Sequence, residues 1–233
     1  MDDRWIVVSN GVTGSFSQVN PSAENPISAE VWTLDMDALE KGWRTPARHP
    51  HRLLNPALAG VDGKLYIFGG AHYDSKLRDE YKKLLTMQGY RSWHNGYIRQ
   101  KYTYELDLKT GEWQRRQDMP YQRSGGEARL YRDRYILVVG GSGHSQEHDS
   151  VRPGRSKWPP EDEWRGYHDQ VLIYDVLRDV WSVLDRPMPY GVNTIQATLS
   201  GETLYVTGGE PAHGFNFNTE DVVMIGRIRM VDQ

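Results

Sequence analysis

Two arginines and one glutamate are the residues of this sequence that most directly suggest chemistry. Arg52 and Arg123 can be aligned with each other in successive repeat units, and two guanidinium groups can hold an anionic substrate through bidentate hydrogen bonds. Glu127 follows Arg123 by four residues and could transfer a proton to or from the bound molecule. We therefore take Arg52, Arg123 and Glu127 as the candidate catalytic residues.

A second set of polar and aromatic residues could bind a ligand near the same site. The tyrosines and histidines could also act as acids or bases, and the amides are suited to hydrogen bonds with sugar hydroxyls. The candidate ligand-binding residues are His51, Asn55, Tyr121, Tyr190, Asn193, Gln196, His144, His168 and His213.

Glu127 also has a structural interpretation. It lies two residues before Arg129 in a predicted strand, so both side chains project from the same face. An ion pair that holds neighbouring units together therefore competes with a role in proton transfer.

The spacing of two further histidines raises the question of a metal site. His144 and His148 are four residues apart beside Asp149, which would place both imidazoles on one face of a helix. The segment lacks the glutamate placement of a His-Glu-x-x-His zinc site, and its context is typical of a loop. We predict no metal site and no cofactor.

A unit that repeats along the chain indicates how these side chains are positioned. Apolar runs end in the glycine pairs 69–70, 140–141 and 208–209, which are 71 and 68 residues apart. A fainter first copy ends in Ser9-Asn10-Gly11. An aspartate and then a tryptophan follow at matching places, as Asp35 and Trp43, Asp107 and Trp113, and Asp175 and Trp181. Repetition on this scale is typical of solenoids and propellers.

Each unit divides into short strands separated by turn residues. In the second unit the predicted strands are about 54–61, 64–68, 101–108 and 113–120, and in the third they are 127–131, 135–139, 170–176 and 181–189. The first and last units have three predicted strands each. The sequence therefore predicts one domain, residues 1–233, with units at about 4–50 (partial), 51–120, 121–189 and 190–233 (partial).

The pattern resembles the kelch repeat, in which a hydrophobic run, a glycine pair, an aromatic residue and a spaced tryptophan follow one another. The matching positions are Tyr66, Gly69, Gly70, Tyr104 and Trp113, and then Val139, Gly140, Gly141, Tyr174 and Trp181. This resemblance implies an all-β, kelch-type β-propeller. About four blades are represented, the first and last incomplete, as part of a six- or seven-bladed ring. The other blades would come from a missing segment or from a second chain.

Long connections between the second and third strands of each unit are predicted to share one face. They include the inserted loops 71–99 and 142–168, and the eight histidines of the chain all fall on this face. One insertion carries apolar residues at helical spacing, which predicts a short helix at 75–88. Scaffolded loops often hold binding groups, although histidines also favour loops for no functional reason.

The resemblance suggests three classes of function. The first is a binding or interaction module that recognises a protein or carbohydrate through the face of the long connections. The second is a sugar-acid enzyme similar to the kelch-type N-acetylneuraminate mutarotases or epimerases, in which channel arginine and glutamate residues bind the carboxylate and transfer protons. The third resembles the central domain of galactose oxidase, whose copper cofactor requires a cysteine. This chain has no cysteine, so we set the third class aside.

Composition excludes some partners. The net charge is −3, without the basic patch of a nucleic-acid-binding protein. No apolar run approaches the roughly 20 residues that span a bilayer, and residues 1–5 do not have the apolar core of a signal peptide. We expect neither nucleic acid nor membrane as a partner, and the compartment is left open.

Overall fold

The structure, a computed structural model, describes residues 4–10, 27–73, 97–143, 167–211 and 222–229. Within these ranges the chain forms β-strands and one short 3-10 turn, η2 (Leu39–Lys41). The helix expected at 75–88 lies outside the described residues, as do His94, His144, His148 and His213.

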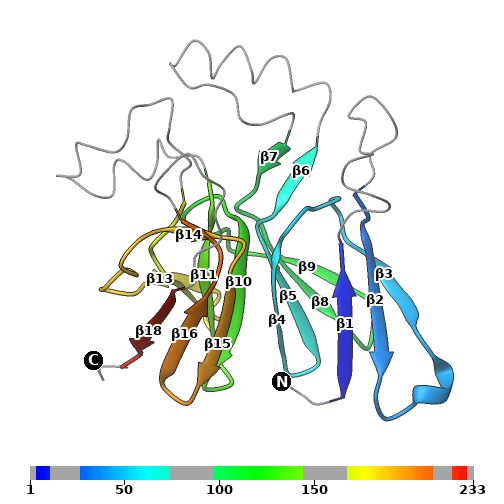
Figure 1. Cartoon of the computed structure of the whole chain (residues 1–233). Coiled ribbons are helices and arrows are strands. Elements are labelled where there is room, and N and C mark those ends of the chain that lie inside the picture. Colours follow the sequence, from blue (N-terminus) through cyan, green and yellow to red (C-terminus); the bar gives the residue numbers. More distant parts are fainter. Residues whose placement is uncertain (1–3, 11–26, 74–96, 144–166, 212–221, 230–233) are drawn as a thin grey trace.

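Four antiparallel sheets follow one another along the chain, and Figure 1 shows them in sequence from β1–β3 on one side to β15–β18 on the other. The first sheet contains β1 (Trp5–Ser9), β2 (Glu30–Asp35) and β3 (Arg44–Arg48). The second contains β4 (Ala57–Val61), β5 (Lys64–Phe68), β8 (Thr103–Asp107) and β9 (Trp113–Arg116). The third contains β10 (Ser124–Tyr131), β11 (Tyr135–Ser142), β12 (Leu172–Asp175) and β13 (Val180–Val183). The fourth contains β15 (Gln196–Ser200), β16 (Thr203–Thr207) and β18 (Val223–Arg227).

Two small ribbons extend from this scaffold. One pairs β6 (Ala71–Tyr73) with β7 (Tyr97–Arg99) at the end of the second sheet, where the long insertion begins and ends. The other pairs β14 (Val192–Asn193) with β17 (Glu210–Pro211). The expected all-β class and the antiparallel order of strands are therefore confirmed.

Strand register aligns the sheets residue by residue. Asp35, Asp107 and Asp175 lie opposite Trp5, Lys64 and Tyr135, and in the fourth sheet Arg227 takes this place opposite Thr203. In the fourth sheet the charges of the ion pair at this end of the strands are reversed accordingly. Arg4 pairs with Asp35 at 2.8 Å and Arg134 with Asp175 at 2.6 Å, whereas Glu202 pairs with Arg227 at 3.3 Å.

Aromatic side chains fill the space between adjacent sheets, and the repeated tryptophan is one of them. The Trp181 ring of the third sheet lies 5.4 Å from the Phe68 ring of the second, edge to face. Its Nε1 also donates a hydrogen bond to the Gln117 carbonyl at 2.9 Å, and the Asp179 carboxylate accepts one from the Gln117 amide at 2.9 Å. Trp43, at the same place in the first sheet, is 47% exposed because no described sheet precedes it.

The glycine pairs permit close contact between one sheet and the linker that leads into the next. Gly69 and Gly70 have φ of 61° and 85°, and the Gly70 amide donates to the Arg123 carbonyl at 2.7 Å. A Cβ atom on Gly69 would lie 2.3 Å from that carbonyl oxygen, which is far inside van der Waals contact. Gly140 repeats the arrangement against the Val192 carbonyl. Only glycine fits here, because both the backbone conformation and the space exclude a side chain.

Replacing Gly69 by alanine separates these two reasons when it is compared with Gly201→Ala. Gly201 has a similar φ of 56°, but a Cβ there would meet no atom within 4 Å. We expect Gly201→Ala to lower the free energy of unfolding by about 1 kcal/mol through backbone strain. Gly69→Ala should lower it by about 3 kcal/mol or more, because strain and steric overlap combine. Equal losses in urea titrations of the two variants would show that the close approach contributes nothing.

Candidate functional site

The inner edge of the sheets consists of β4, β10 and β15, which lie side by side, and the linkers that lead into them. Asn55 and Thr194 in these linkers and Gly125, the second residue of β10, all have left-handed backbones, with φ of 49°, 53° and 77°. The Gly125 amide donates to the Asn55 carbonyl at 2.9 Å, and the Thr194 amide donates to the Gly125 carbonyl at 2.8 Å. A line of main-chain hydrogen bonds therefore joins three successive units, and it fixes which residues are equivalent.

This equivalence corrects the sequence alignment of the two arginines. Arg123, two residues before Gly125, corresponds to Leu53 and Val192, and all three side chains are buried. Arg52 lies one residue earlier in its linker and is exposed. The alignment of Arg52 with Arg123 is therefore wrong by one residue. The linkers share a backbone conformation but not side-chain types, so similarity of residues misled the alignment.

Arg123 holds the third sheet together from inside. Its side chain is 2% exposed, and its guanidinium donates to the carbonyls of Val138 at 3.2 Å, Gly140 at 3.0 Å and Gln170 at 2.8 Å. Burial lowers the pKa of Arg123 to about 9, while Tyr121 and Asp169 act in the opposite direction. The cation is thus retained at neutral pH, and its hydrogen bonds are directed to the backbone rather than to a ligand.

The other two candidate catalytic residues make different contacts. Arg52 donates through Nη1 to the Ile27 carbonyl at 2.9 Å. Glu127 forms the anticipated ion pair with Arg129, with Oε2 and Nη1 2.7 Å apart, and both side chains are partly exposed. Arg129 also donates through Nε to the Ala197 carbonyl of the fourth sheet. Arg52, Arg123 and Glu127 therefore engage three separate sets of partners.

The candidate ligand-binding residues are distributed over several surroundings. Asn55 and Gln196 are exposed at the inner edge, and Asn193 donates through Nδ2 to Thr194 Oγ1 at 3.1 Å. Tyr190 is half-buried against the core between the third and fourth sheets. The ring of Tyr121 stacks at 6.1 Å on that of His168, which is buried with Nε2 3.0 Å from the Gln122 carbonyl.

His51 belongs to a cluster that the sequence only partly indicated. The His51 cluster comprises His51, Tyr102, Tyr104 and Arg115, at the end of the second sheet that carries β6 and β7. Nε2 of His51 lies 3.0 Å from the Tyr104 hydroxyl, which accepts from Arg115 Nη1 at 3.1 Å. The Arg115 guanidinium also lies 3.9 Å from the Tyr102 ring centroid, a cation–π contact. Strand register places Tyr104 of β8 directly opposite Arg115 of β9. The sequence alone does not reveal this pairing, so the cluster could not be identified from it.

The charge state of this cluster follows from its surroundings. Burial lowers the pKa of His51, and the positive charges of His72 and Arg115 lower it further. The imidazole is therefore neutral at pH 7 and can accept a hydrogen bond from the Tyr104 hydroxyl. Arg115 keeps its charge beside Asp118. The cluster combines an aromatic face, a fixed cation and a neutral imidazole.

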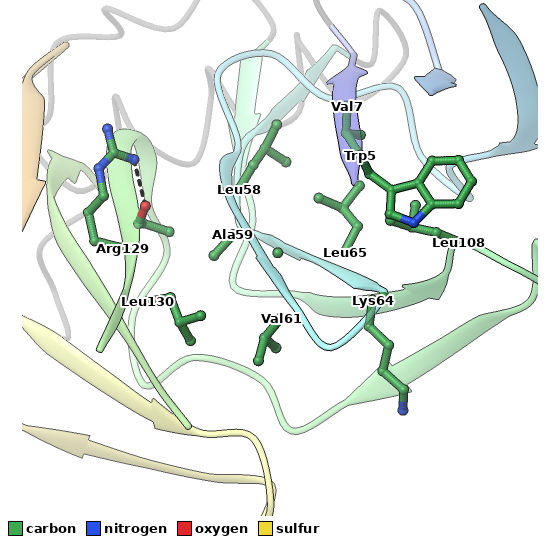
Figure 2. Close-up of a pocket in the computed structure, with 13 residues that line it drawn as sticks. Trp5, Val7, Leu58, Ala59, Val61, Lys64, Leu65, Leu108, Arg129 and Leu130 are labelled. Carbon is green, nitrogen blue, oxygen red and sulfur yellow. Dashed lines mark hydrogen bonds between the residues drawn. The ribbon is translucent and has the colours of Figure 1, made fainter. Parts of the chain in front are cut away.

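A small cavity lies at the inner edge near β1, and sequence reasoning missed it (Figure 2). Its volume is about 240 Å³, and its lining is mostly apolar, with Trp5, Val7, Leu58, Leu65, Ala128 and Leu130 among the residues. Lys64 and Arg129 also border it, and the dashed line in Figure 2 marks the hydrogen bond from Arg129 Nη1 to the Ala128 carbonyl at 2.7 Å. This volume is enough for one or two apolar side chains. It is smaller than the 300–1,000 Å³ typical of sites that bind drug-sized molecules.

The fold defines a kelch-type β-propeller, an all-β class built from repeated antiparallel sheets. The solved structure of YjhT is similar to this chain, with a TM-score of 0.61 and 18% sequence identity. The match covers 90% of this chain and 56% of that one, so the chain spans little more than half the length of YjhT. At this identity the likeness establishes the fold alone. No family model and no curated protein matches the sequence.

Two negative findings apply to the described ranges. None of their helices is long and apolar enough to cross a membrane. They also contain no group of three or more histidine, aspartate or glutamate side chains arranged to hold a metal ion.

Replacing Arg123 by methionine tests whether this arginine is structural. The substitution keeps much of the apolar stem but leaves three buried carbonyls without their donor, so the free energy of unfolding should fall by about 3 kcal/mol or more. Arg52→Met, the matched control, should change it by less than about 1 kcal/mol because that side chain is exposed. Denaturant titration of both variants measures the difference. A larger loss for Arg52→Met would reverse the assignment.

His49, next to the His51 cluster, should make stability depend on pH. It is buried edge-on against Tyr104 and Trp113, its Nδ1 accepts the His51 amide proton, and burial lowers its pKa from 6.5 to about 4. At pH values between these two pKa values, the unfolded chain binds more protons than the folded chain. The stabilisation is therefore complete above pH 6.5 and is lost as the pH falls toward 4, by up to about 3 kcal/mol.

His49→Asn is the control for this titration, because the amide oxygen can still accept the His51 proton but does not titrate. The variant should flatten the decline in unfolding free energy between pH 6.5 and 4. Any decline that remains comes from His51 and, at the acid end, from carboxylates with lowered pKa such as Asp35 and Glu105. Identical profiles for the two proteins would contradict the role of His49.

Proposed function

We propose that this propeller is a binding module that recognises a protein or carbohydrate ligand on the face of the long connections. The observation that carries the proposal is the His51 cluster at this end of the second sheet. Its aromatic ring, guanidinium and neutral imidazole are already held by hydrogen bonds and a cation–π contact. Binding to such a site requires little ordering of side chains.

The chemistry of the cluster suits hydroxyl-rich or aromatic ligands. Arg115 has a partly exposed side chain, so N–H groups not used by Tyr104 and Asp118 can donate to a ligand oxygen. Tyr102 and His51 are half-buried and leave part of their rings open to contact. A sugar ring or an aromatic side chain could stack there while Arg115 donates at its edge.

Catalysis by the three residues first considered has less support. Arg123 is enclosed by backbone carbonyls, Arg52 holds the segment at Ile27, and Glu127 is paired with Arg129. An enzyme that binds a carboxylate and moves a proton needs such groups within reach of one molecule.

The alternative is a sugar-acid enzyme of the mutarotase type that the kelch resemblance suggests. One observation favours it: Glu127 and Arg129 project together from an inner strand, and both remain partly exposed. Exchange of sialic-acid anomers, followed by NMR with and without the protein, tests this activity. Acceleration that is lost in Glu127→Gln would establish it, and unchanged exchange would leave the binding module.

Binding is tested by a glycan array on the full chain, followed by titration with the strongest ligand. We expect Arg115→Gln and Tyr102→Leu to weaken binding at least about tenfold, since each removes a contact worth roughly 1.4 kcal/mol. Arg132→Gln is the control, because Arg132 is exposed in the turn between β10 and β11, where it pairs with Glu202. Unchanged binding in the cluster variants would exclude this site. Absence of any glycan ligand would leave a protein as the partner.

A further inference from the structure

The linkers that lead into the second, third and fourth sheets repeat one local arrangement. In each linker a buried residue is followed by an exposed proline and then by a half-buried ring. The three segments are His49-Pro50-His51, Met119-Pro120-Tyr121 and Met188-Pro189-Tyr190. The ring is therefore always the third residue of the segment.

Main-chain hydrogen bonds show that these segments are equivalent. The amide of the first residue in each segment donates to a carbonyl of the sheet before it. The acceptors are Ala29 at 2.7 Å, Lys101 at 2.8 Å and Asp169 at 2.8 Å, each six residues before the aspartate that strand register aligns. The rings of His51, Tyr121 and Tyr190 therefore occupy the same place at the start of three successive sheets.

At two of these places the ring of the linker stacks with a ring from the sheet that follows. The His51 ring lies 5.4 Å from the Tyr102 ring, with 32° between their planes. The Tyr121 ring lies 6.1 Å from the His168 ring, with 21° between their planes. Tyr102 and His168 both precede the third strand of their sheet, β8 or β12. Each of these two sheets thus supplies a pair made of one tyrosine and one histidine.

Both pairs lie at the end of the sheets where the long connections begin. In the second sheet this end carries β6 and β7, and in the third it carries the bridge between Ser142 and Tyr167. His168 is 1% exposed beneath the half-buried Tyr121, so the imidazole covers one face of that tyrosine and leaves another part of the ring accessible. Neighbouring sheets, joined side by side through β4 and β10, therefore present two partly exposed ring surfaces on one face.

We propose that the ligand of this face is a linear oligosaccharide that crosses the second and third sheets, with one sugar against the His51 cluster and another against Tyr121. A site that repeats from sheet to sheet fits a ligand that is itself a repeat. Sugar rings carry C–H groups on their faces and hydroxyls at their rims, which match aromatic rings with polar edges. This inference rests on the function proposed above and specifies the ligand and its course.

Occupation of both pairs by one molecule raises affinity beyond that of either pair. The Gly125 amide donates to the Asn55 carbonyl at 2.9 Å, and this main-chain bond fixes the second and third sheets relative to each other. Once one sugar is bound at the His51 cluster, the next contact is intramolecular and needs no second loss of translational freedom. Stacking already holds both pairs of rings, so little further ordering is required.

Isothermal titration calorimetry on the full chain tests the proposal with oligosaccharides of one to six units. The probes are the cello-, malto-, chito- and galacturono-oligosaccharide series. We expect one series to show a Kd that falls at least about tenfold at the length that reaches both pairs. A gradual fall in proportion to the number of units would reflect only the number of ways in which a longer chain can occupy one site. That result would overturn the proposal.

Tyr121→Leu separates the second pair from the first. The variant should lose the tenfold gain of the long probes and keep the affinity of the wild type for the shortest probe that binds. Tyr121→Phe retains the ring and should retain the gain. Tyr135→Leu is the matched control, because Tyr135 lies in the same sheet at the opposite end, beside the turn between β10 and β11. It should leave binding at every length unchanged.

A second variant guards against loss of folding, since Tyr121 also packs against the core between the second and third sheets. Tyr121→Met removes the ring but fills much of the same volume, and its Tm is measured beside that of Tyr121→Leu. Whichever variant keeps its affinity for the short probe is used.

The remaining outcomes distinguish this proposal from the function on which it rests. A gain with length that persists without the Tyr121 ring overturns the second contact and leaves the binding module. Absence of binding in all four series overturns the oligosaccharide and leaves a protein as the ligand of the module. Short probes whose affinity is unchanged in Tyr102→Leu exclude the His51 cluster, and with it both proposals.

Discussion

The contact between a glycine pair and the next linker is the constraint on which the arrangement of the sheets depends. With no Cβ on Gly69, the Arg123 carbonyl can approach the backbone closely and accept the Gly70 amide proton. The linker is thereby fixed, and the inner strand that follows begins in register with its neighbour. Only then can the tryptophan of the later sheet reach the earlier one, as Trp181 reaches Phe68.

Buried charge in this protein mainly joins strands to one another. Arg123 donates to carbonyls of β11 and of the segment that leads into β12, and Glu105 joins Lys64 at 2.6 Å and Arg116 at 2.6 Å across the second sheet. Hydrogen bonds from Lys64, Tyr66 and Arg116 outweigh burial and lower the pKa of Glu105. Glu105 therefore has the partners that its loss of hydration requires, and Arg123 directs both terminal nitrogens to backbone carbonyls. In the His51 cluster, by contrast, the charge of Arg115 remains partly exposed.

The sequence predicted the fold well because its signals are local. Glycine pairs, turn residues and spaced tryptophans each depend on a few neighbouring residues, and they indicated the strand order before any contact was known. The candidate site was less predictable. The interior place of Arg123 depends on carbonyls 15 to 47 residues away, and the partnership of Tyr102, Tyr104 and Arg115 appears only once β8 and β9 are in register. The cavity beside β1 could not be predicted, because its lining comes from strands of three different sheets and not from one motif.

The main-chain link through Asn55, Gly125 and Thr194 has a consequence for how this protein can diversify. These hydrogen bonds use main-chain amide and carbonyl groups alone. Asn55 carries an amide side chain, Gly125 has no side chain, and Thr194 carries a hydroxyl. The side chains of Asn55 and Thr194 are therefore not needed for this link, apart from tolerating a left-handed backbone, whereas a Cβ at Gly125 would lie 2.3 Å from Asn193 Oδ1. Single substitutions at the first and last of these positions can alter the chemistry of the inner rim while the main-chain link between the units is kept.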